Sequence, residues 1–223
     1  MAIKLEVSRA DLSFEAGFPK PEFDLFREEG ALLACLYHRL EPHGLRLPDI
    51  RFERGGNVGD QHVLVYLFDF SMTVRIRVER IEIHCSNLPQ HLLEKFKAAI
   101  LDVLRAVKEY RQEISFRVLA AAVGLHGTLE GKTVRDYLAQ FVTGAPENLG
   151  PSTGAGAVFY FGAEGERLFS TVTVDVSAAV PNGLFVRIHG SWDGGRVAPD
   201  AFAGTADSFV RQALDGLALQ LSS

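Results

Sequence analysis

The sequence predicts an α+β protein in which a β-α-β-β-β-α unit occurs twice, with an antiparallel sheet that carries its helices on one face. Val65–Ser71 resembles Val172–Ser177, and the aspartates of the two segments are 106 residues apart (175 − 69). Ile83-His84 recurs as Ile188-His189, with the histidines 105 residues apart (189 − 84). A long segment of helical periodicity follows each copy. Such repetition of a supersecondary unit is a signal of architecture.

The predicted repeats span residues 1–112 and 113–223, either as two domains or as one continuous domain. In the first repeat, alternating apolar and polar residues predict a strand from Ile3 to Ala16. Leucines at helical spacing predict a helix over 21–40. A second helix is predicted over 89–111, because Leu92, Phe96, Ile100, Val103, Leu104 and Val107 have helical spacing.

The middle of the first repeat predicts one unusually long strand. Apolar residues occupy every even position from Leu64 to Val78, and neither Gly nor Pro interrupts them. A tight turn at Glu79-Arg80 would then lead into the next strand. This register places Arg77 opposite Glu82, a favourable cross-strand charge pair.

The second repeat predicts the same order of elements. Strands are expected over 114–122, 158–161, 168–180 and 184–190, and helices over 133–142 and 199–221. Pro181–Gly183 is a strong turn signal, and a three-residue turn there puts Asp175 opposite His189. The segment 144–156 is rich in Gly and Pro and is predicted to be a mobile loop.

This order of elements resembles the duplicated saddle of the TATA-binding protein family. The resemblance is architectural and covers most of the chain. It implies a broad sheet that two repeats share about a pseudo-twofold axis. The DNA-intercalating phenylalanines of that family have no counterpart in this sequence, and a net charge of −5 does not favour DNA.

The composition is that of a folded globular protein, with 47% hydrophobic and 23% charged residues in a chain of 223. The apolar runs are strand-sized, so no membrane span is predicted. The N-terminal segment lacks a signal-peptide core, and a cytoplasmic location is therefore expected. Cys35 and Cys85 lie in apolar stretches and are expected to be reduced and buried.

The outer face of the sheet is where chemistry is expected, because helices cover the other face. Asp175 beside His189 would orient the imidazole ring and raise its basicity, as a general base requires, with Arg187 on the same face. The alternative is an exposed charge pair of little energetic effect. The first repeat does not duplicate this pair, since its register places His84 opposite Arg75.

A candidate binding surface lies on the outer face of the first repeat. Val63, Val65 and Leu67 are predicted to form an apolar strip there, and such a strip needs a cover. A subunit interface, a ligand groove or a loop of the same chain could supply it, and the interface is favoured. Arg75 and Arg77 lie on the same predicted face and complete the candidate surface. A homodimer is therefore expected.

No metal or cofactor is predicted, because the seven histidines and two cysteines show no metal-ligand spacing and the chain has no phosphate-loop motif. A nucleophile-elbow motif is also missing, which favours a non-catalytic role. We therefore expect a binding or assembly module that acts through its outer sheet face, as a homo-oligomer or with a protein partner. The alternatives are a small-ligand binder or hydrolase using Asp175 and His189, and nucleic-acid binding through Arg75, Arg77 and Arg117.

Overall fold

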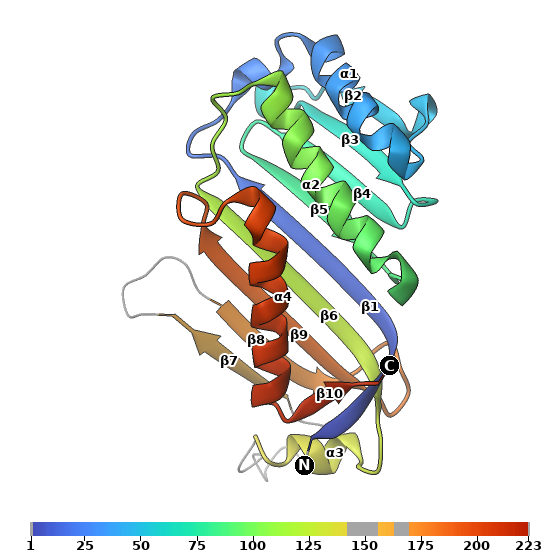
Figure 1. The fold of residues 1–223 in the computed structure, drawn as a ribbon. Coiled ribbons are helices and arrows are strands. Elements are labelled where there is room, and N and C mark those ends of the chain that lie inside the picture. The colour runs from blue at the N-terminus through green and yellow to red at the C-terminus, as the bar shows by residue number, and fades with distance from the viewer. Residues whose placement is uncertain (1, 142–155, 163–169, 223) are drawn as a thin grey trace. The chain divides into compact units, whose positions relative to one another are not determined.

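The computed structural model describes residues 2–141, 156–162 and 170–222, and it confirms the predicted α+β class (Figure 1). The strands in these residues are β1 (Ile3–Gly17), β2 (Ile50–Glu53), β3 (His62–Leu67), β4 (Met72–Arg77), β5 (Arg80–Cys85), β6 (Val118–Leu129), β7 (Ala157–Phe161), β8 (Ser170–Val176), β9 (Leu184–Asp193) and β10 (Leu219–Leu221). The helices are α1 (Glu29–Leu40), α2 (Leu93–Tyr110), α3 (Val134–Leu138) and α4 (Pro199–Gly216). The predicted loop 144–156 lies outside the described residues, apart from Gly156.

The strands hydrogen-bond in the order β2-β3-β4-β5-β1-β6-β9-β8-β7. The hairpins of this sheet are antiparallel, as predicted. β10 is an addition that pairs in parallel with Ile3–Leu5 of β1. Its pairing joins segments from opposite ends of the chain, so no local sequence pattern indicates it.

The internal duplication is not confirmed. In sheet order the first half contributes β3-β4-β5-β1 and the second half contributes β7-β8-β9-β6, which are corresponding arrangements. The first half also contains β2, and the repeated motif forms different structures in the two halves. Val65–Ser71 is the end of a strand and a turn, whereas Val172–Ser177 lies in β8 and the residue after it. Two repeats over 1–112 and 113–223 therefore remain a prediction.

The chain forms two compact units. Unit 1 comprises residues 1–11, 122–190 and 205–223, and unit 2 comprises residues 12–121 and 191–204. The strands β1, β6 and β9 and the helix α4 contribute residues to both. Each unit is described by itself below.

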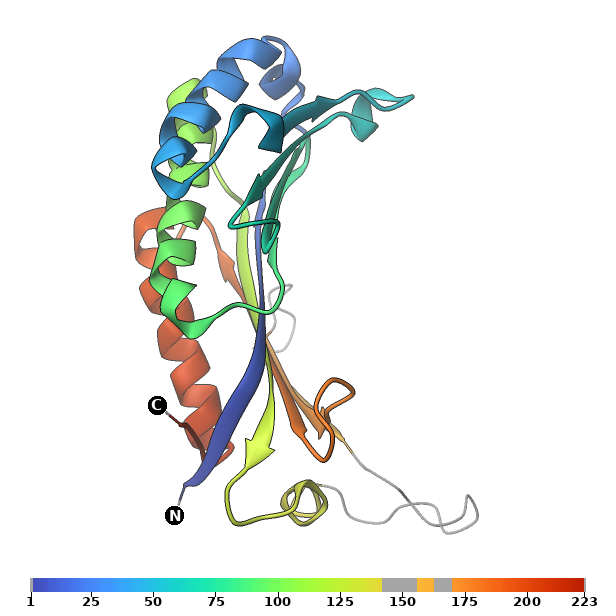
Figure 2. The same ribbon diagram turned by 90° about the vertical axis from the view of Figure 1, so that its right-hand side faces the viewer.

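In unit 2, α1 and α2 lie on one face of the strands β2–β5, as Figure 2 shows. Apolar side chains from this face of the strands and from the two helices are fully buried, namely Val63, Val65, Met72, Val74, Ile76, Ile81, Leu32, Leu36, Ala99 and Val103. Removal of this apolar surface from water is the main contribution to the stability of the unit. Neither helix covers the opposite face of β2–β5, which we call the open face.

The single long strand predicted over Leu64–Val78 is wrong, because the chain reverses at Phe68–Ser71 and forms the hairpin β3–β4. The Ser71 N–H donates to the Phe68 carbonyl at 3.0 Å. Phe68, Asp69 and Phe70 all have left-handed backbone conformations, with φ of 51°, 52° and 68°. This turn contains none of the Gly or Asn residues that usually signal it, so the alternating pattern conceals it.

The turn reverses the parity of the buried positions. Val65 pairs with Val74 across β3 and β4, so odd positions face the core before the turn and even positions face it afterwards. Val63, Val65 and Leu67 are consequently buried beneath the helices, with 0%, 0% and 2% exposure. The predicted exposed strip is therefore wrong. The helices of the same chain cover Val63, Val65 and Leu67. These residues therefore give no reason to expect a subunit interface.

The cross-strand pairing of β4 and β5 is shifted by two residues from the predicted register. Ile76 pairs with Ile81, and Arg75 lies directly opposite Glu82, where Arg77 was expected. A physical reason is that the turn itself is bound: the Phe18 and Glu22 N–H groups donate to the carbonyls of residues 79 and 78 at 2.9 Å and 2.6 Å. A shift of two residues keeps every side chain on its predicted face.

The core of unit 1 collects the inward side chains of β8 and β9 with those of α3 and α4. Its members include Leu5, Leu125, Val134, Tyr137, Leu138, Val172, Val174, Val186, Ile188, Leu214 and Leu217. The buried Tyr137 hydroxyl donates to the Leu217 carbonyl at 2.8 Å. Burial raises the pKa of this hydroxyl, so Tyr137 stays neutral and joins α3 to the end of α4.

The β8–β9 hairpin corrects the second predicted register. Asp175 lies opposite Phe185, and His189 lies opposite Thr171, so the predicted Asp175–His189 pair is wrong. The loop opens at Ser177, whose N–H donates to the Gly183 carbonyl at 2.7 Å. The Ser177 hydroxyl oxygen also accepts the N–H groups of residues 179 and 180, which fixes a longer loop than the three-residue turn expected.

We expect Val65→Glu to prevent stable folding rather than to separate subunits. A carboxylate at this fully buried position has no partner, and an unpaired buried charge costs roughly 3–5 kcal/mol or more. The control is Thr73→Glu, which places the same charge on the other face of the hairpin and should change stability by about 1 kcal/mol or less. Urea unfolding followed by circular dichroism measures both variants. Wild-type stability in Val65→Glu would contradict the inward placement.

Candidate functional site

The open face of unit 2 carries a row of charged and aromatic side chains across adjacent strands. In register, Arg51 of β2, Leu64 of β3, Arg75 of β4 and Glu82 of β5 lie side by side. Leu64 is only 4% exposed although it points away from the helices. The aliphatic stems of long neighbouring side chains cover such a residue while their charged ends stay in water. The arginines therefore form part of the surface packing as well as its charge.

Arg75 is the unsatisfied member of this row. Its Nε atom is buried and has no hydrogen-bond partner, and no described carboxylate forms an ion pair with it. Glu82 directly opposite is already engaged, because its carboxylate lies 2.8 Å from Arg80 Nε and 3.4 Å from Arg77 Nε. Arg51 has no described carboxylate partner either and lies over the Tyr66 ring, 5.8 Å from its centre. The open face thus holds positive charge that unit 2 does not neutralise.

The other residues predicted for this region fall in several places. Arg75 and Arg77 lie on one face of β4, as expected, with Arg75 at the centre of the row. His84 lies opposite Thr73 rather than Arg75. Arg117 is exposed and immediately precedes β6, so it is not part of the group of β4 arginines.

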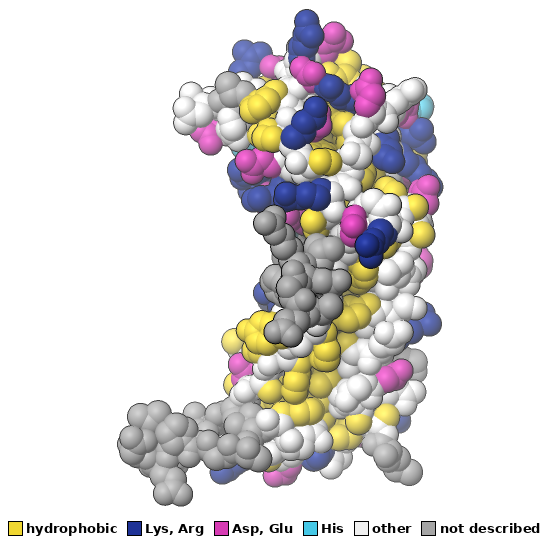
Figure 3. All heavy atoms as spheres, turned by 90° about the vertical axis from the view of Figure 1, so that its left-hand side faces the viewer, with side chains coloured by type: hydrophobic (Ala, Val, Ile, Leu, Met, Phe, Trp, Pro, Cys, Tyr) yellow, Lys and Arg dark blue, Asp and Glu magenta, His cyan; other side chains and the backbone are white. Residues whose placement is uncertain are grey.

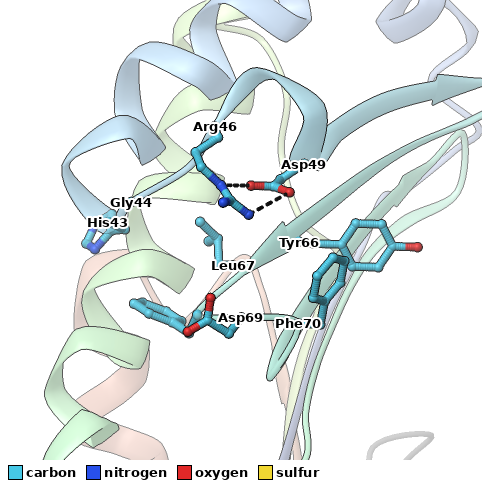
Figure 4. Close-up of a pocket in the computed structure, with 9 residues that line it drawn as sticks. His43, Gly44, Arg46, Asp49, Tyr66, Leu67, Asp69 and Phe70 are labelled. Atoms are coloured by element: carbon cyan, nitrogen blue, oxygen red, sulfur yellow. Dashed lines mark hydrogen bonds and ion pairs between the residues drawn. The ribbon is translucent and has the colours of Figure 1, made fainter.

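A hollow of about 210 Å³ opens at the end of the β3–β4 hairpin (Figure 4). It is lined by His43, Gly44, Arg46, Asp49, Tyr66, Leu67, Phe68, Asp69 and Phe70. Figure 4 shows Arg46 and Asp49 on one side of Leu67 and the Asp69 carboxylate on the other, with Tyr66 and Phe70 together at one end. Charges of both signs therefore converge on one small cavity with an aromatic end.

Arg46 is held in one orientation at this hollow. Its Nε and Nη2 atoms donate to the two carboxylate oxygens of the buried Asp49 at 2.7 Å and 3.3 Å. These hydrogen bonds, together with the negative charges of Asp49 and Asp69, raise the pKa of Arg46. Such a fork leaves the Nη1 edge of the guanidinium for another acceptor.

The left-handed turn forms the opposite wall of the hollow. A left-handed conformation costs an ordinary residue roughly 1–2 kcal/mol, and three consecutive residues adopt it here. Aromatic packing supports the turn on both sides: the Phe68 ring lies 5.2 Å from Phe96 of α2, and the Phe70 ring lies 5.2 Å from Tyr66. Asp69 between them makes no hydrogen bond or ion pair with a described residue. Its carboxylate is therefore available to a ligand.

At the other end of the hollow, His43 is already satisfied by its own unit. Its Nε2 atom lies 2.8 Å from Asp102 Oδ2 of α2, and both side chains are largely buried. This contact anchors the 3₁₀ turn Glu41–His43 to the helix. A structural role explains the geometry of this histidine.

In unit 1, the candidate residues Asp175, Arg187 and His189 share the outward face of the hairpin but do not meet. Asp175 is four residues away from the position opposite His189, and its carboxylate accepts the Val176 N–H at 2.7 Å. Arg187 is exposed and lies opposite Thr173. The pair on which the general-base hypothesis depended is therefore absent.

A different histidine contacts a serine and an aspartate in this unit. His126 Nδ1 lies 2.8 Å from Ser177 Oγ, and His126 Nε2 lies 3.9 Å from Asp11 Oδ2. The Ser177 oxygen already accepts two backbone N–H groups, so its hydroxyl hydrogen donates to Nδ1. A hydroxyl bound in this way shapes the β8–β9 loop and is poorly placed as a nucleophile. Asp11 is beyond hydrogen-bond reach of the ring, so these residues do not form a catalytic triad.

Neither a metal centre nor a membrane span emerges from the described part of the chain. No cluster of three or more His, Cys, Asp or Glu side chains among its described residues could hold a metal ion. Within the same residues, no helix combines the length and apolar character needed to cross a bilayer.

Comparison with known proteins gives no family for this chain. No protein-family model matches it, and no curated protein is significantly similar to it in sequence. The resemblance to the TATA-binding protein fold is therefore unconfirmed, and function must be argued from the sites themselves.

The hollow and Arg51 are the features that the sequence analysis missed. The alternating pattern predicts Asp69 within a strand, and the turn that exposes it has no Gly, Pro or Asn to indicate it. No pattern in the sequence indicates that Arg46 and Asp49 bind each other. Only the three-dimensional register brings these segments together.

We expect His126 to make the protein less stable in mild acid. Burial lowers the pKa of His126, with the nearby Asp11 acting against this shift and Arg9 with it. An unfolded histidine has a pKa of about 6.5, so below that pH the unfolded chain binds a proton that the folded ring resists. His126 therefore has no effect on the free energy of unfolding above about pH 6.5. The free energy of unfolding falls as the pH decreases below that value and levels off below the pKa of His126 in the folded protein.

The measurement is the urea midpoint of wild type and of His126→Gln at about pH 7.5 and about pH 5.5. The variant cannot take up this proton, so its midpoint should fall less than that of the wild type. Equal decreases in the two proteins would show that His126 titrates normally in the folded state.

Proposed function

We propose that this protein is a non-catalytic binding module whose open face in unit 2 holds an acidic segment of a protein partner. The observation that carries the proposal is the guanidinium of Arg75, whose buried Nε atom makes no hydrogen bond and which has no ion-pair partner among the described residues. A carboxylate that lies over β4 would form charge-assisted hydrogen bonds with this group, which are stronger than hydrogen bonds between neutral groups. Arg51 is a second cation on the adjacent part of the face.

The surroundings of Arg75 favour a mixed acidic and apolar partner. Tyr66 lies on the same face, and the neighbouring Phe70 is 62% exposed. Exposed aromatic rings beside arginine are typical of the centres of protein interfaces. A segment with one or two carboxylates next to an apolar side chain would complement this surface.

A protein partner fits this face better than a nucleic acid. Tight binding of nucleic acid depends on the neutralisation of several phosphates in series. Of the β2–β5 arginines on this face, Arg77 and Arg80 form ion pairs with Glu82, although Arg77 Nε, like Arg75 Nε, makes no hydrogen bond. Glu15 lies beside Glu82 on the same face and would repel an extended phosphate backbone. The two remaining arginines suit a short acidic segment.

We expect Arg75→Gln to weaken binding of a fluorescent Ser-Glu-Phe-Glu-Ser peptide by about tenfold, because a hydrogen bond to a charged group contributes about 1.5–3 kcal/mol. Fluorescence anisotropy at low salt measures the affinity. Lys95→Gln is the matched control, since it removes one positive charge from the exposed side of α2.

A Ser-Gln-Phe-Gln-Ser peptide and a short single-stranded DNA are the comparison ligands. The proposal requires the acidic peptide to bind more tightly than both. It is wrong if Arg75→Gln and Lys95→Gln have equal effects, or if the DNA binds more tightly than the acidic peptide.

A second candidate function is assembly, for which the strand β7 in unit 1 provides an observation. β7 ends the strand order and pairs only with β8 among the described residues. Val158, Tyr160 and Phe161 of this strand are 48%, 74% and 51% exposed. Figure 3 faces this side of unit 1 and shows hydrophobic side chains gathered there. The strand has no charge or proline to prevent pairing with another strand.

The partner that we propose for β7 is the β7 strand of a second copy. Antiparallel pairing of identical strands about a twofold axis is self-complementary. An uncharged strand meets no repulsion from its own copy, and it has no charge by which to select another partner. This edge replaces the buried Val63–Leu67 strip as the reason to expect a homodimer.

We expect Tyr160→Lys to shift the protein from dimer to monomer, because edge lysines oppose strand pairing. Analytical ultracentrifugation over a range of concentrations measures the shift. Leu47→Lys is the control, since Leu47 is also an exposed apolar residue, at 70%, but lies in a 3₁₀ turn of unit 2. A wild-type protein that is monomeric at the highest concentration would refute assembly through this edge.

A further inference from the structure

The hollow at the β3–β4 turn presents one cationic and one anionic group to the same small space. Asp49 binds Nε and Nη2 of Arg46, so the remaining Nη1 edge is the part of the guanidinium left for a ligand. The Asp69 carboxylate lies on the other side of Leu67 and has no hydrogen-bond or ion-pair partner among the described residues (Figure 4). A ligand that bridges these two groups must carry a carboxylate and a cation.

The size and the walls of the hollow restrict the ligand further. A water molecule occupies about 30 Å³ in the liquid, so a space of about 210 Å³ corresponds to roughly seven waters. Tyr66 and Phe70 form an aromatic end, and Leu67 forms part of the lining between the charged groups. His43 and Gly44 line the opposite end.

We propose that this hollow binds a small zwitterion of the size of a free α-amino acid with an apolar side chain. The ligand carboxylate accepts hydrogen bonds from Nη1 of Arg46, and its ammonium group donates to the Asp69 carboxylate. Its apolar side chain lies against Tyr66 and Phe70. The hollow shares Tyr66 and Phe70 with the surface proposed for the acidic segment, but its charged groups, Arg46 and Asp69, are different residues from Arg75.

The fixed guanidinium of Arg46 and the fixed backbone of Asp69 support this assignment. Bidentate contact with Asp49 fixes the plane of the Arg46 guanidinium, and the bound turn fixes the backbone of Asp69. Groups that are already positioned lose little conformational entropy when a ligand binds. The left-handed backbone at Asp69 is also a conformation that asparagine adopts readily, so its charge can be removed without loss of the turn.

The test uses L-leucine as the probe, with two analogues that each lack one charge. 3-Methylbutylamine lacks the carboxylate, and 4-methylpentanoate lacks the ammonium group. Isothermal titration calorimetry and saturation-transfer NMR with the full chain measure binding. Leucine should bind about tenfold or more tightly than either analogue, as expected when one charged hydrogen-bonding group is lost.

The variants Arg46→Gln and Asp69→Asn separate the two contacts. Arg46→Gln should weaken leucine about tenfold and leave 3-methylbutylamine unchanged, whereas Asp69→Asn should weaken leucine and leave 4-methylpentanoate unchanged. Arg54→Gln is the control, because Arg54 is exposed and pairs with Glu29 away from the hollow. Circular dichroism confirms that each variant is folded.

The proposal is overturned if leucine does not bind, if one analogue binds as tightly as leucine, or if Arg54→Gln has the same effect as Arg46→Gln. The acidic-peptide experiment at Arg75 is a separate measurement. Failure of leucine binding would leave its result unchanged, and failure of peptide binding would leave the hollow as proposed.

Discussion

The left-handed turn at Phe68–Ser71 is the constraint on which the rest of unit 2 depends. It reverses the parity of the hairpin, so Val65 and Val74 both face the helices while Tyr66 and Arg75 reach the open face. Three left-handed residues are unfavourable in isolation. Contacts of Phe68 with Phe96 and of Phe70 with Tyr66 act against that cost, because the rings meet only when the turn forms. The same turn builds one wall of the hollow.

Where no turn interrupts a strand, the alternation of apolar and polar residues correctly predicted which side chains share a face of the sheet. The same patterns predicted the cross-strand registers poorly. The predicted turns of β4–β5 and β8–β9 were displaced by two and four residues along the register. Both displacements are even, so Arg77, Asp175 and Arg187 kept their predicted faces. The errors arise from hydrogen bonds that alternation cannot reveal, such as the N–H groups that bind Ser177 Oγ. At Val65 the predicted face of the sheet was itself wrong. Phe68 and Phe70 continue the alternation of apolar residues through the turn, so the pattern does not show that the chain reverses there.

Polar groups in this protein divide into those that are satisfied within their unit and those that are not. Tyr137 bonds to the Leu217 carbonyl, His126 to Ser177 and His43 to Asp102, and each contact joins separate segments of one unit. Buried polar groups with partners stabilise a unique arrangement of the chain. Conspicuous residues of this kind, histidines above all, therefore gave weak guidance to function. Their geometry is explained without any ligand.

The unsatisfied groups are more informative, because a charge without a partner has a free-energy cost that binding can recover. Arg75 is such a group, because its Nε atom is buried without a hydrogen-bond partner. Asp69 differs, since its exposed carboxylate is hydrated, but it too has no hydrogen-bond or ion-pair partner among the described residues. Both residues belong to the β3–β4 hairpin of unit 2. They carry opposite charges and face different spaces, one a sheet surface and the other a hollow of about 210 Å³. A flat surface suits an extended partner, whereas a concave hollow suits a small molecule. One hairpin thus carries residues of both proposed sites, and its turn sets the faces on which they lie.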